Sequence, residues 1–330
     1  MIVGRDAPLS DVLRYRIGGR ARFLVDAQSP DDVRQAVAFV REHSVESVLF
    51  VGHGANLLFP DDYFDGAVIR LVDPVQPQGA VAEGEEGLIK SYAGETLDRL
   101  IQRAFDSGLV GLEWAGGLPG TVGAAVRGNV GAFGGEVKDW VRDVTVLDIA
   151  DDAPHVLTLR RDELDFVYRG SLLKQKRNLI ALGASFCLRR GSAADLARAR
   201  DTYRANIAYR EARHPMDYPP TGSTFKNIAA PDEVARVLAV FPDLTERVLG
   251  DWHGKVSMGF LNRRLGFSGY RVGNAEVSEK HCNFVLNLGG ARARDVAGII
   301  GTIQQRFEDT FGFRPEPEVE IVREPAREGG

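Results

Sequence analysis

Hydrophobic residues recur at helical spacing in three stretches of the chain. The first follows a capping signal, Ser29-Pro30, and predicts a helix over residues 30–43. The second predicts a helix from Leu97 that ends at Gly108, and the third predicts a long helix closed by Phe311-Gly312. The apolar positions that set this spacing are Val33, Ala36, Val37 and Val40; Leu97, Leu100, Ile101, Ala104 and Phe105; and Val296, Ile299, Ile300, Ile303 and Phe307.

Short runs of β-branched and aliphatic residues predict strands. Residues 48–51 form one such run, which enters the tight loop Gly52-His53-Gly54 and completes a βαβ-like unit with the helix over 30–43. Three more runs, separated by charged turns, predict a sheet over 144–147, 156–159 and 179–182.

Proline residues mark a domain boundary in the second half of the chain. The charged, alanine-rich stretch 193–210 predicts a helical connector, and the prolines at 215, 219 and 220 interrupt regular structure after it. We therefore predict two subdomains over 1–70 and 71–205 and a C-terminal domain over 206–330. Residues 228–265 are predicted to form a surface elaboration of that last domain.

Composition narrows the class of protein. The 330 residues carry 41 Lys+Arg against 46 Asp+Glu, a net charge of −5, which argues against a dedicated nucleic-acid binder. No apolar run approaches the roughly 18 residues of a membrane helix, and the N-terminus lacks the apolar core of a secretory signal. The two cysteines form no disulfide framework, and the six histidines include no zinc motif. We expect a cytoplasmic protein without metal or membrane insertion, monomeric or weakly oligomeric.

Glycine is concentrated in one segment. Nine of the 37 glycines lie between Gly111 and Gly135, where Glu113 and Arg127 are the only charged residues. Such backbone offers bare N–H groups to a pyrophosphate at close range, which favours a nucleotide cofactor over a purely structural role. The shorter loop 52–58 matches neither a Rossmann fingerprint nor a P-loop, so a structural turn remains the alternative there.

Several motifs together resemble one enzyme family. The chain contains VGHGANLL, GLEWAGGLPGTVGAAVRGNVGAFGGE, YRGS, GSTFKN, VSEKHCNF and PEPEV in this order. Between about residues 16 and 322 it is therefore similar to the UDP-N-acetylenolpyruvoylglucosamine reductases of peptidoglycan synthesis. The resemblance implies an α+β fold, in which an FAD-binding module of the vanillyl-alcohol-oxidase (PCMH-like) type precedes a smaller α+β substrate-binding domain.

The resemblance also implies a cofactor site built from both glycine loops. FAD would be bound without a covalent link, and NADPH would be the co-substrate. Ala55 stands where the family usually has serine, and Phe133 where it often has tyrosine. The residues implied to bind FAD are Gly52, His53, Gly54, Ala55, Asn56, Leu57, Gly117, Gly120, Thr121, Gly123, Asn129, Gly131 and Ala132.

Three residues are implied to be catalytic. Arg169 in YRGS would bind and polarise the substrate carboxylate, Ser223 in GSTFKN would donate a proton, and Glu318 in PEPEV would be the catalytic glutamate. Taken alone, Arg169 is typical of a surface arginine at a strand end, and Ser223 is typical of a turn cap. Glu316 is an alternative to Glu318, because both point to one face of an extended strand.

The same motifs imply the substrate site and the reaction. Tyr168, Lys226 and Asn227 would bind UDP-N-acetylglucosamine enolpyruvate, which FAD reduced by NADPH would convert to UDP-N-acetylmuramate. His281 receives no chemical role. Two alternatives remain, a flavin oxidase or dehydrogenase of the same superfamily with another substrate, and a flavin-binding module that regulates a partner without turnover.

Overall fold

The computed structural model describes residues 1–75, 80–83 and 86–322 and has an α+β fold. The chain divides into two compact units. Unit 1 contains Met1–Ala7, Ala21–His53 and Phe64–Ala212, whereas unit 2 contains Pro8–Arg20, Gly54–Tyr63 and the described residues from Arg213 onward. Two short N-terminal segments thus belong to the same unit as the C-terminal third. The division into 1–70, 71–205 and 206–330 stays a prediction.

The elements of unit 1 follow from the patterns of the sequence. Its strands are β1 (Ile2–Pro8), β2 (Arg20–Ala27), β3 (Ser47–Val51), β5 (Phe64–Leu71), β6 (Ala80–Glu83), β7 (Glu86–Tyr92), β8 (Leu109–Val110), β9 (Gly131–Ala132), β10 (Gly135–Glu136), β11 (Val141–Asp148), β12 (His155–Arg160) and β13 (Leu179–Arg190). Its helices are α1 (Pro30–Glu42), α2 (Leu97–Asp106), η2 (Glu113–Ala115), α3 (Val122–Arg127), η3 (Val137–Asp139), η4 (Arg161–Leu164), α4 (Leu172–Gln175) and α5 (Ala193–Arg213).

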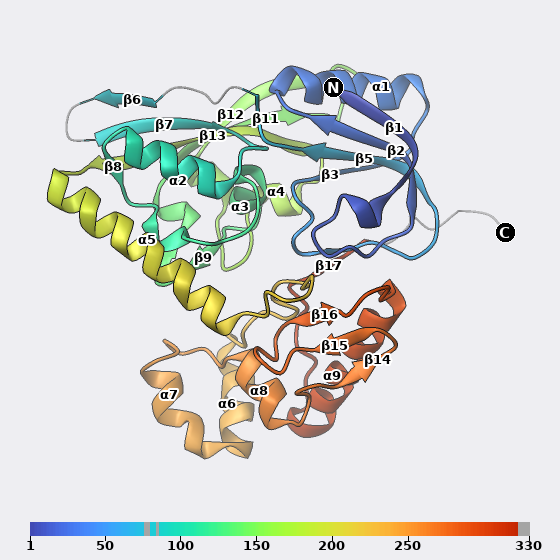
Figure 1. The fold of residues 1–330 in the computed structure, drawn as a ribbon, viewed down its shortest axis with the longest axis vertical. Coiled ribbons are helices and arrows are strands. Elements are labelled where there is room, and N and C mark those ends of the chain that lie inside the picture. Colours follow the sequence, from blue (N-terminus) through green and yellow to red (C-terminus); the bar gives the residue numbers. More distant parts are fainter. Residues whose placement is uncertain (76–79, 84–85, 323–330) are drawn as a thin grey trace. The chain divides into compact units, whose positions relative to one another are not determined.

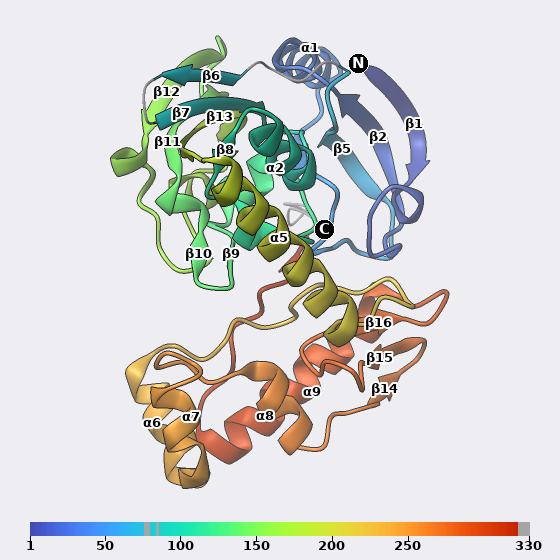
Figure 2. The same ribbon diagram turned by 60° about the vertical axis from the view of Figure 1, so that its left-hand side comes forward.

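Unit 1 has two large sheets (Figure 1) and a small one formed by β9 and β10. One large sheet has the order β1-β2-β5-β3, and β2 and β3 both run parallel to β5. Helix α1 buries Val33, Ala36, Val37 and Val40 in the core of this sheet. The other sheet has the order β12-β11-β13-β7-β6, and α2 packs its apolar face into the second core. Helix α5 passes α2 (Figure 2). Tyr203 of α5 contacts Phe105 of α2 edge-on, with ring centroids 5.8 Å apart.

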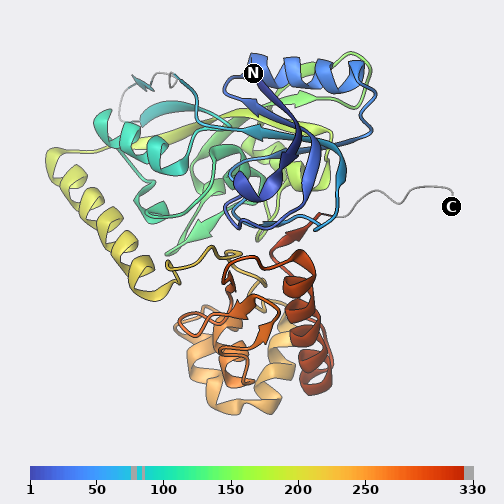
Figure 3. The same ribbon diagram turned by 45° about the vertical axis from the view of Figure 1, so that its right-hand side comes forward.

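Unit 2 is built around one long helix. Its elements are η1 (Leu9–Asp11), β4 (Leu57–Leu58), α6 (Pro231–Val240), η5 (Pro242–Leu244), α7 (Thr245–Leu249), α8 (Met258–Arg264), β14 (Arg271–Val272), β15 (Ala275–Val277), β16 (Val285–Asn287), α9 (Ala293–Phe311) and β17 (Glu320–Ile321). Helix α9, dark red in Figure 3, packs against β14, β15 and α6. Strand β17 pairs in parallel with β4, so the last described strand joins a segment from the N-terminal half.

The predicted helices and strands are confirmed. Ser29 accepts a hydrogen bond from the Asp32 amide (3.1 Å) at the start of α1, as the capping signal predicts. Gly108 and Gly312 end α2 and α9 in the left-handed region, with φ +75° and +76°. The three β-branched runs lie in β11, β12 and β13.

The prediction of a surface elaboration over 228–265 is wrong. Val237, Val248, Met258 and Leu261 are buried in the core of unit 2 together with residues of α9. Helices α6, α7 and α8 are therefore part of the domain's packing rather than an addition to its surface, because burying these side chains is what stabilises short helices.

Candidate active site

The glycine-rich segment of unit 1 combines close packing with one open turn. A Cβ on Gly52 would lie 2.5 Å from the Thr121 Oγ1, and a Cβ on Gly123 would lie 2.8 Å from the Ala93 Cβ. Only glycine fits at these two positions. Gly120 differs, because its φ is +124° and a Cβ there would meet no atom within 4 Å. The structure thus brings Gly52 against Thr121 and leaves Gly120 accessible.

Backbone N–H groups around this open turn are available to a ligand. Within the described residues, the amides of Gly117, Gly120 and Thr121 donate no hydrogen bond. Amides on left-handed glycine turns form a concave set of donors that suits an anion such as a pyrophosphate. The donor set and the space beside Gly120 therefore fit the pyrophosphate of FAD, and Gly117, Gly120 and Thr121 would hold it.

Tyr168 and Arg169 occupy a two-residue turn. Val167 and Gly170 exchange backbone hydrogen bonds of 3.0 and 3.2 Å across it, so both side chains project from its tip. Arg169 has a left-handed φ of +57°, a conformation that costs free energy for a residue with a Cβ. Its guanidinium lies over the Tyr168 ring (5.5 Å) and donates to the Gly131 carbonyl (3.1 Å). This geometry holds a charged fork in a defined direction.

Asn129 anchors the turn that carries Arg169. Its side chain is buried, and its Nδ2 donates to the Val167 carbonyl (3.0 Å) and to Glu136 Oε2 (2.9 Å). Its Oδ1 accepts a hydrogen bond from the Lys138 amide (3.1 Å). The protein thus uses both ends of this amide to hold the turn.

Arg210 is a residue that the sequence analysis missed. Its Nε donates to the Gly116 carbonyl (3.0 Å), its guanidinium lies over the Phe133 ring (5.1 Å), and a Cβ on Gly117 would lie 3.1 Å from its Cδ. Burial and the nearby positive charge of Arg169 lower the pKa of Arg210. Two guanidinium groups this close favour an anionic ligand. Arg210 lies in a helix rich in arginine, so no local signal separates it from solvated neighbours.

Ser223 and Glu318 are brought together in unit 2 by backbone pairing. The carbonyl of Thr224, the next residue after Ser223, accepts hydrogen bonds from the amides of Glu318 (2.8 Å) and Val319 (3.3 Å). No hydrogen bond of the Ser223 side chain is found among the residues described, so the turn-cap alternative has no capping bond here. Ser223 is therefore adjacent in sequence to a residue that pairs with the Glu318 backbone, and the donor of its hydroxyl is uncommitted within the described residues.

The neighbouring charged residues separate Glu316 from Glu318. Lys226 Nζ forms an ion pair with Glu316 Oε1 (2.5 Å), and the Lys226 amide donates to the Glu316 carbonyl (3.0 Å). Glu316 thus has a partner on the surface, with its side chain 68% exposed, whereas Glu318 is half-buried. Asn227 accepts a hydrogen bond from the Met258 amide (3.1 Å). The roles of Lys226 and Asn227 in substrate binding stay predictions.

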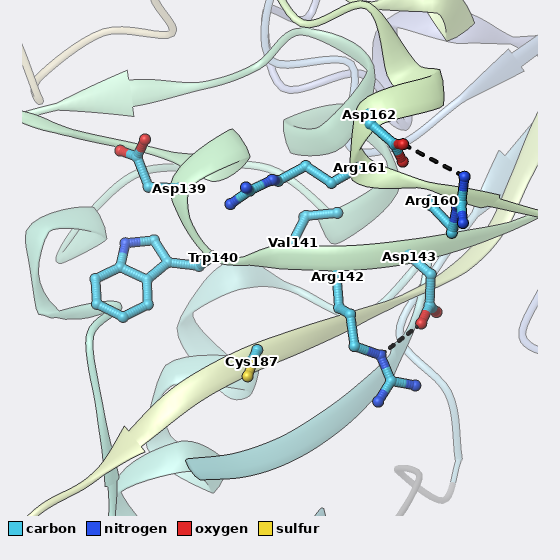
Figure 4. Close-up of a pocket in the computed structure, with 9 residues that line it drawn as sticks. All are labelled: Asp139, Trp140, Val141, Arg142, Asp143, Arg160, Arg161, Asp162 and Cys187. Carbon is cyan, nitrogen blue, oxygen red and sulfur yellow. Dashed lines mark hydrogen bonds and ion pairs between the residues drawn. The ribbon is translucent and has the colours of Figure 1, made fainter.

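A separate pocket in unit 1 contains none of the predicted site residues (Figure 4). It has a volume of about 480 Å³ and is lined by Trp140, Cys187 and a ring of charged residues from η3, β11 and η4. Arg142 pairs with Asp143 (2.8 Å) and Arg160 with Asp162 (3.4 Å), so much of its charge is neutralised internally. This pocket lacks the glycine segment and Arg169, and we do not assign the reaction to it.

The described part of the chain contains neither a cluster of metal-ligating side chains nor a membrane-spanning helix. Within residues 1–75, 80–83 and 86–322, no three His, Cys, Asp or Glu side chains gather in a way that could hold a metal ion. No helix in this part of the chain is long and apolar enough to cross a membrane.

Two family models match most of the chain. Residues 21–156 match the FAD binding domain, and residues 214–322 match the UDP-N-acetylenolpyruvoylglucosamine reductase C-terminal domain. The first match contains the glycine-rich segment, and the second contains Ser223 and Glu318. The predicted fold class, an FAD-binding module followed by a smaller domain, is confirmed.

Whole-chain relatives lead to the same family. The chain is 34% identical over 318 residues to the UDP-N-acetylenolpyruvoylglucosamine reductase of Lachnoclostridium phytofermentans, a match that covers 96% of this chain and 92% of the relative. It is 34% identical over 320 residues to that of Caldicellulosiruptor saccharolyticus, covering 97% and 92%. The crystal structure of the Thermus caldophilus reductase superposes with a TM-score of 0.71 at 28% identity and covers 98% of this chain and all of the other. The FAD-binding match contains the glycine segment, the C-terminal match contains Ser223 and Glu318, and the relatives span both. The chain therefore belongs to the UDP-N-acetylenolpyruvoylglucosamine reductase family.

Proposed function

We propose that this protein is an FAD-dependent oxidoreductase that reduces UDP-N-acetylglucosamine enolpyruvate to UDP-N-acetylmuramate with NADPH, a step in peptidoglycan precursor synthesis. The observation that carries the proposal is the pairing in unit 2 of Thr224, the residue after Ser223, with the backbone of Glu318 within the matched C-terminal domain. FAD, when bound and reduced by NADPH, would supply the hydride for the terminal methylene carbon of the enolpyruvyl group. The residues of the chain supply the remaining steps.

Arg169 would bind the substrate carboxylate. As hydride adds to the methylene carbon, negative charge develops on the adjacent carbon and its carboxylate. A guanidinium fixed by Gly131 and by the Tyr168 ring can stabilise that charge without reorganising during the reaction. The nearby charge of Arg210 would strengthen the positive potential felt by an anion at this turn.

Ser223 would deliver the proton that completes the reduction. Its Oγ–H would protonate the α carbon of the enolate, which gives the saturated lactyl ether. A hydroxyl is a weak acid, and it can donate here because the enolate is a strong base formed at short range. The absence of a hydrogen-bond partner for the Ser223 hydroxyl among the described residues leaves the donor available.

Glu318 would act on the same enolate in one of two ways. A carboxylate repels developing negative charge, so Glu318 contributes either as a protonated hydrogen-bond donor or by orienting another group. Lys226, Asn227 and Tyr168 are proposed to bind the sugar nucleotide.

The test is an assay of NADPH consumption by the purified, flavin-loaded protein. Consumption that requires UDP-N-acetylglucosamine enolpyruvate and yields UDP-N-acetylmuramate by mass spectrometry supports the proposal. NADPH-independent oxidation of another substrate would point to an oxidase or dehydrogenase. Flavin binding without any turnover of the enolpyruvyl sugar would point to a regulatory module. The cytoplasmic location and the monomeric or weakly oligomeric state stay predictions.

A further inference from the structure

The two polar atoms of the Asn56 side chain differ in their hydrogen bonding. Its Nδ2 donates a hydrogen bond to the Glu318 carbonyl (3.0 Å). Its Oδ1 is buried and accepts no hydrogen bond from any residue that the structure describes. The Oδ1 lies 3.5 Å from where a Cβ on Gly222 would stand, next to Ser223. The planar amide of Asn56 thus binds Glu318 through Nδ2, while its Oδ1 has no hydrogen-bond donor in the described part of the chain.

Both sides of the Glu318 peptide are held. Asn56 binds its carbonyl, and the Thr224 carbonyl accepts from its amide (2.8 Å). The backbone of Asn56 adds a further bond, because its carbonyl accepts from the Glu320 amide (3.0 Å) where β4 and β17 pair. The direction of the Glu318 side chain therefore depends on Thr224 and on Asn56, which is 262 positions away in sequence.

We propose that Asn56 is a positioning residue for Glu318, and that its Oδ1 accepts a hydrogen bond from the bound ligand. This inference rests on the proposed function, since it requires Glu318 to take part in the reaction. It differs from the role expected of Asn56 as a cofactor contact alone. A buried polar atom without a partner carries a desolvation penalty, and a ligand N–H or O–H that reaches Oδ1 removes it. Because the amide is planar, a ligand that fixes Oδ1 also fixes the donor to Glu318.

The test is a double-mutant cycle with Asn56→Ala and Glu318→Gln, followed by stopped flow at saturating FAD. Reoxidation of the reduced enzyme by the enolpyruvyl substrate should fall about 10²-fold in Asn56→Ala, since a displaced catalytic group costs about that much. In the double variant the loss should not exceed that of the more impaired single variant. If the fold-losses of the two single variants multiply in the double variant, the inference is overturned. Reoxidation within about threefold of the wild-type rate in flavin-loaded Asn56→Ala would also overturn it.

A second measurement needs neither FAD nor activity. Hydrogen exchange of the peptide that contains Glu318, Val319 and Glu320 should quicken at least tenfold in Asn56→Ala. It should stay at the wild-type rate in Asn274→Ala, an exposed asparagine of unit 2. If hydrogen exchange of this peptide is unchanged in Asn56→Ala, Asn56 does not position Glu318, and this holds even if the variant fails to bind flavin. If Glu318→Gln alone keeps full activity, the proposed role of Glu318 fails instead, whatever the exchange data show.

Discussion

The glycine segment of unit 1 and the paired segments around Ser223 in unit 2 are built in opposite ways. The glycine segment is continuous in sequence, and its shape comes from residues such as Gly117 and Gly120 that adopt left-handed conformations. The site in unit 2 joins residues as far apart as Asn56 and Glu318, which are separated by 262 positions. Local conformation is encoded by residue type, whereas strand pairing depends on the whole fold. Substitutions should therefore affect cofactor binding in the first region and catalysis in the second.

The strongest test of this division is Ser223→Ala. Reoxidation of the reduced enzyme by the enolpyruvyl substrate should fall by roughly 10²- to 10⁴-fold, the usual range for loss of a general acid. Flavin reduction by NADPH should stay near the wild-type rate, because that half-reaction takes no proton from serine. Stopped-flow traces of the two half-reactions measure both. Equal slowing of both halves would mean a damaged fold, and an unslowed second half would mean another proton donor.

Arg169→Lys tests whether the turn in unit 1 works by charge or by geometry. Lysine keeps the positive charge but loses the planar fork and the bond to the Gly131 carbonyl. A charge-assisted hydrogen bond is worth about 1.5–3 kcal/mol, so we expect kcat/KM to fall roughly 10- to 100-fold. Arg161→Lys, an exposed arginine of the same unit, is the matched control. Wild-type turnover in Arg169→Lys would remove Arg169 from the mechanism.

Gly120→Val asks whether the open turn contacts the cofactor. A branched side chain there would enter space that the protein leaves open, and we expect at least a tenfold weaker affinity for FAD, measured by titration of the apoprotein. Backbone strain is an alternative cause, because the φ of Gly120 is +124°. Gly134→Val controls for it, since Gly134 is also left-handed (φ +84°) with open space around it. If both variants lose the same affinity for FAD, a specific contact between Gly120 and the cofactor is contradicted.

The smallest effect concerns pH and the fold of unit 2. Burial lowers the pKa of His281, and the charge of Arg263 adds to this. At a pH below about 6.5, the ordinary pKa of histidine, His281 is protonated in the unfolded chain but still neutral in the folded protein. The stability of the fold therefore falls as the pH drops from about 6.5 towards the lower pKa of the folded state. Thermal unfolding between pH 7.5 and pH 5.5 should show this loss, and it should be smaller in His281→Gln. An identical pH dependence in the variant would refute the contribution of His281.

Local signals account for what the sequence could predict. The spacing in α1, α2 and α9 and the β-branched runs of β11 to β13 predict elements that the structure contains, since one buried face determines each pattern. The glycine segment was also found, because residue type alone marks it. Arg210 was missed, since only its contacts with Gly116 and Phe133 distinguish it from other arginines of α5.

Tertiary packing explains the remaining failures. Residues 228–265 contain short helices, and the burial of their apolar side chains becomes visible only once α9 provides a surface to pack on. The contacts of Asn56 with Glu318 and of Thr224 with Glu318 have no counterpart in local sequence patterns. They require the pairing of β4 with β17, which composition and periodicity do not encode.

The mixed origin of unit 2 has a consequence for the order of events during synthesis. Tyr15, Ile17 and Leu58 emerge from the ribosome early, yet they are buried in a core whose other members come after residue 213. These side chains cannot reach their native core until residues after 213 have been translated. An isolated segment from 214 to 322 would have the reverse defect, since it lacks three core residues whose burial is worth roughly 1.5–3 kcal/mol each. We expect such a segment to aggregate or remain partly folded, and unit 2 to acquire its stability only after α9 and β17 have been translated.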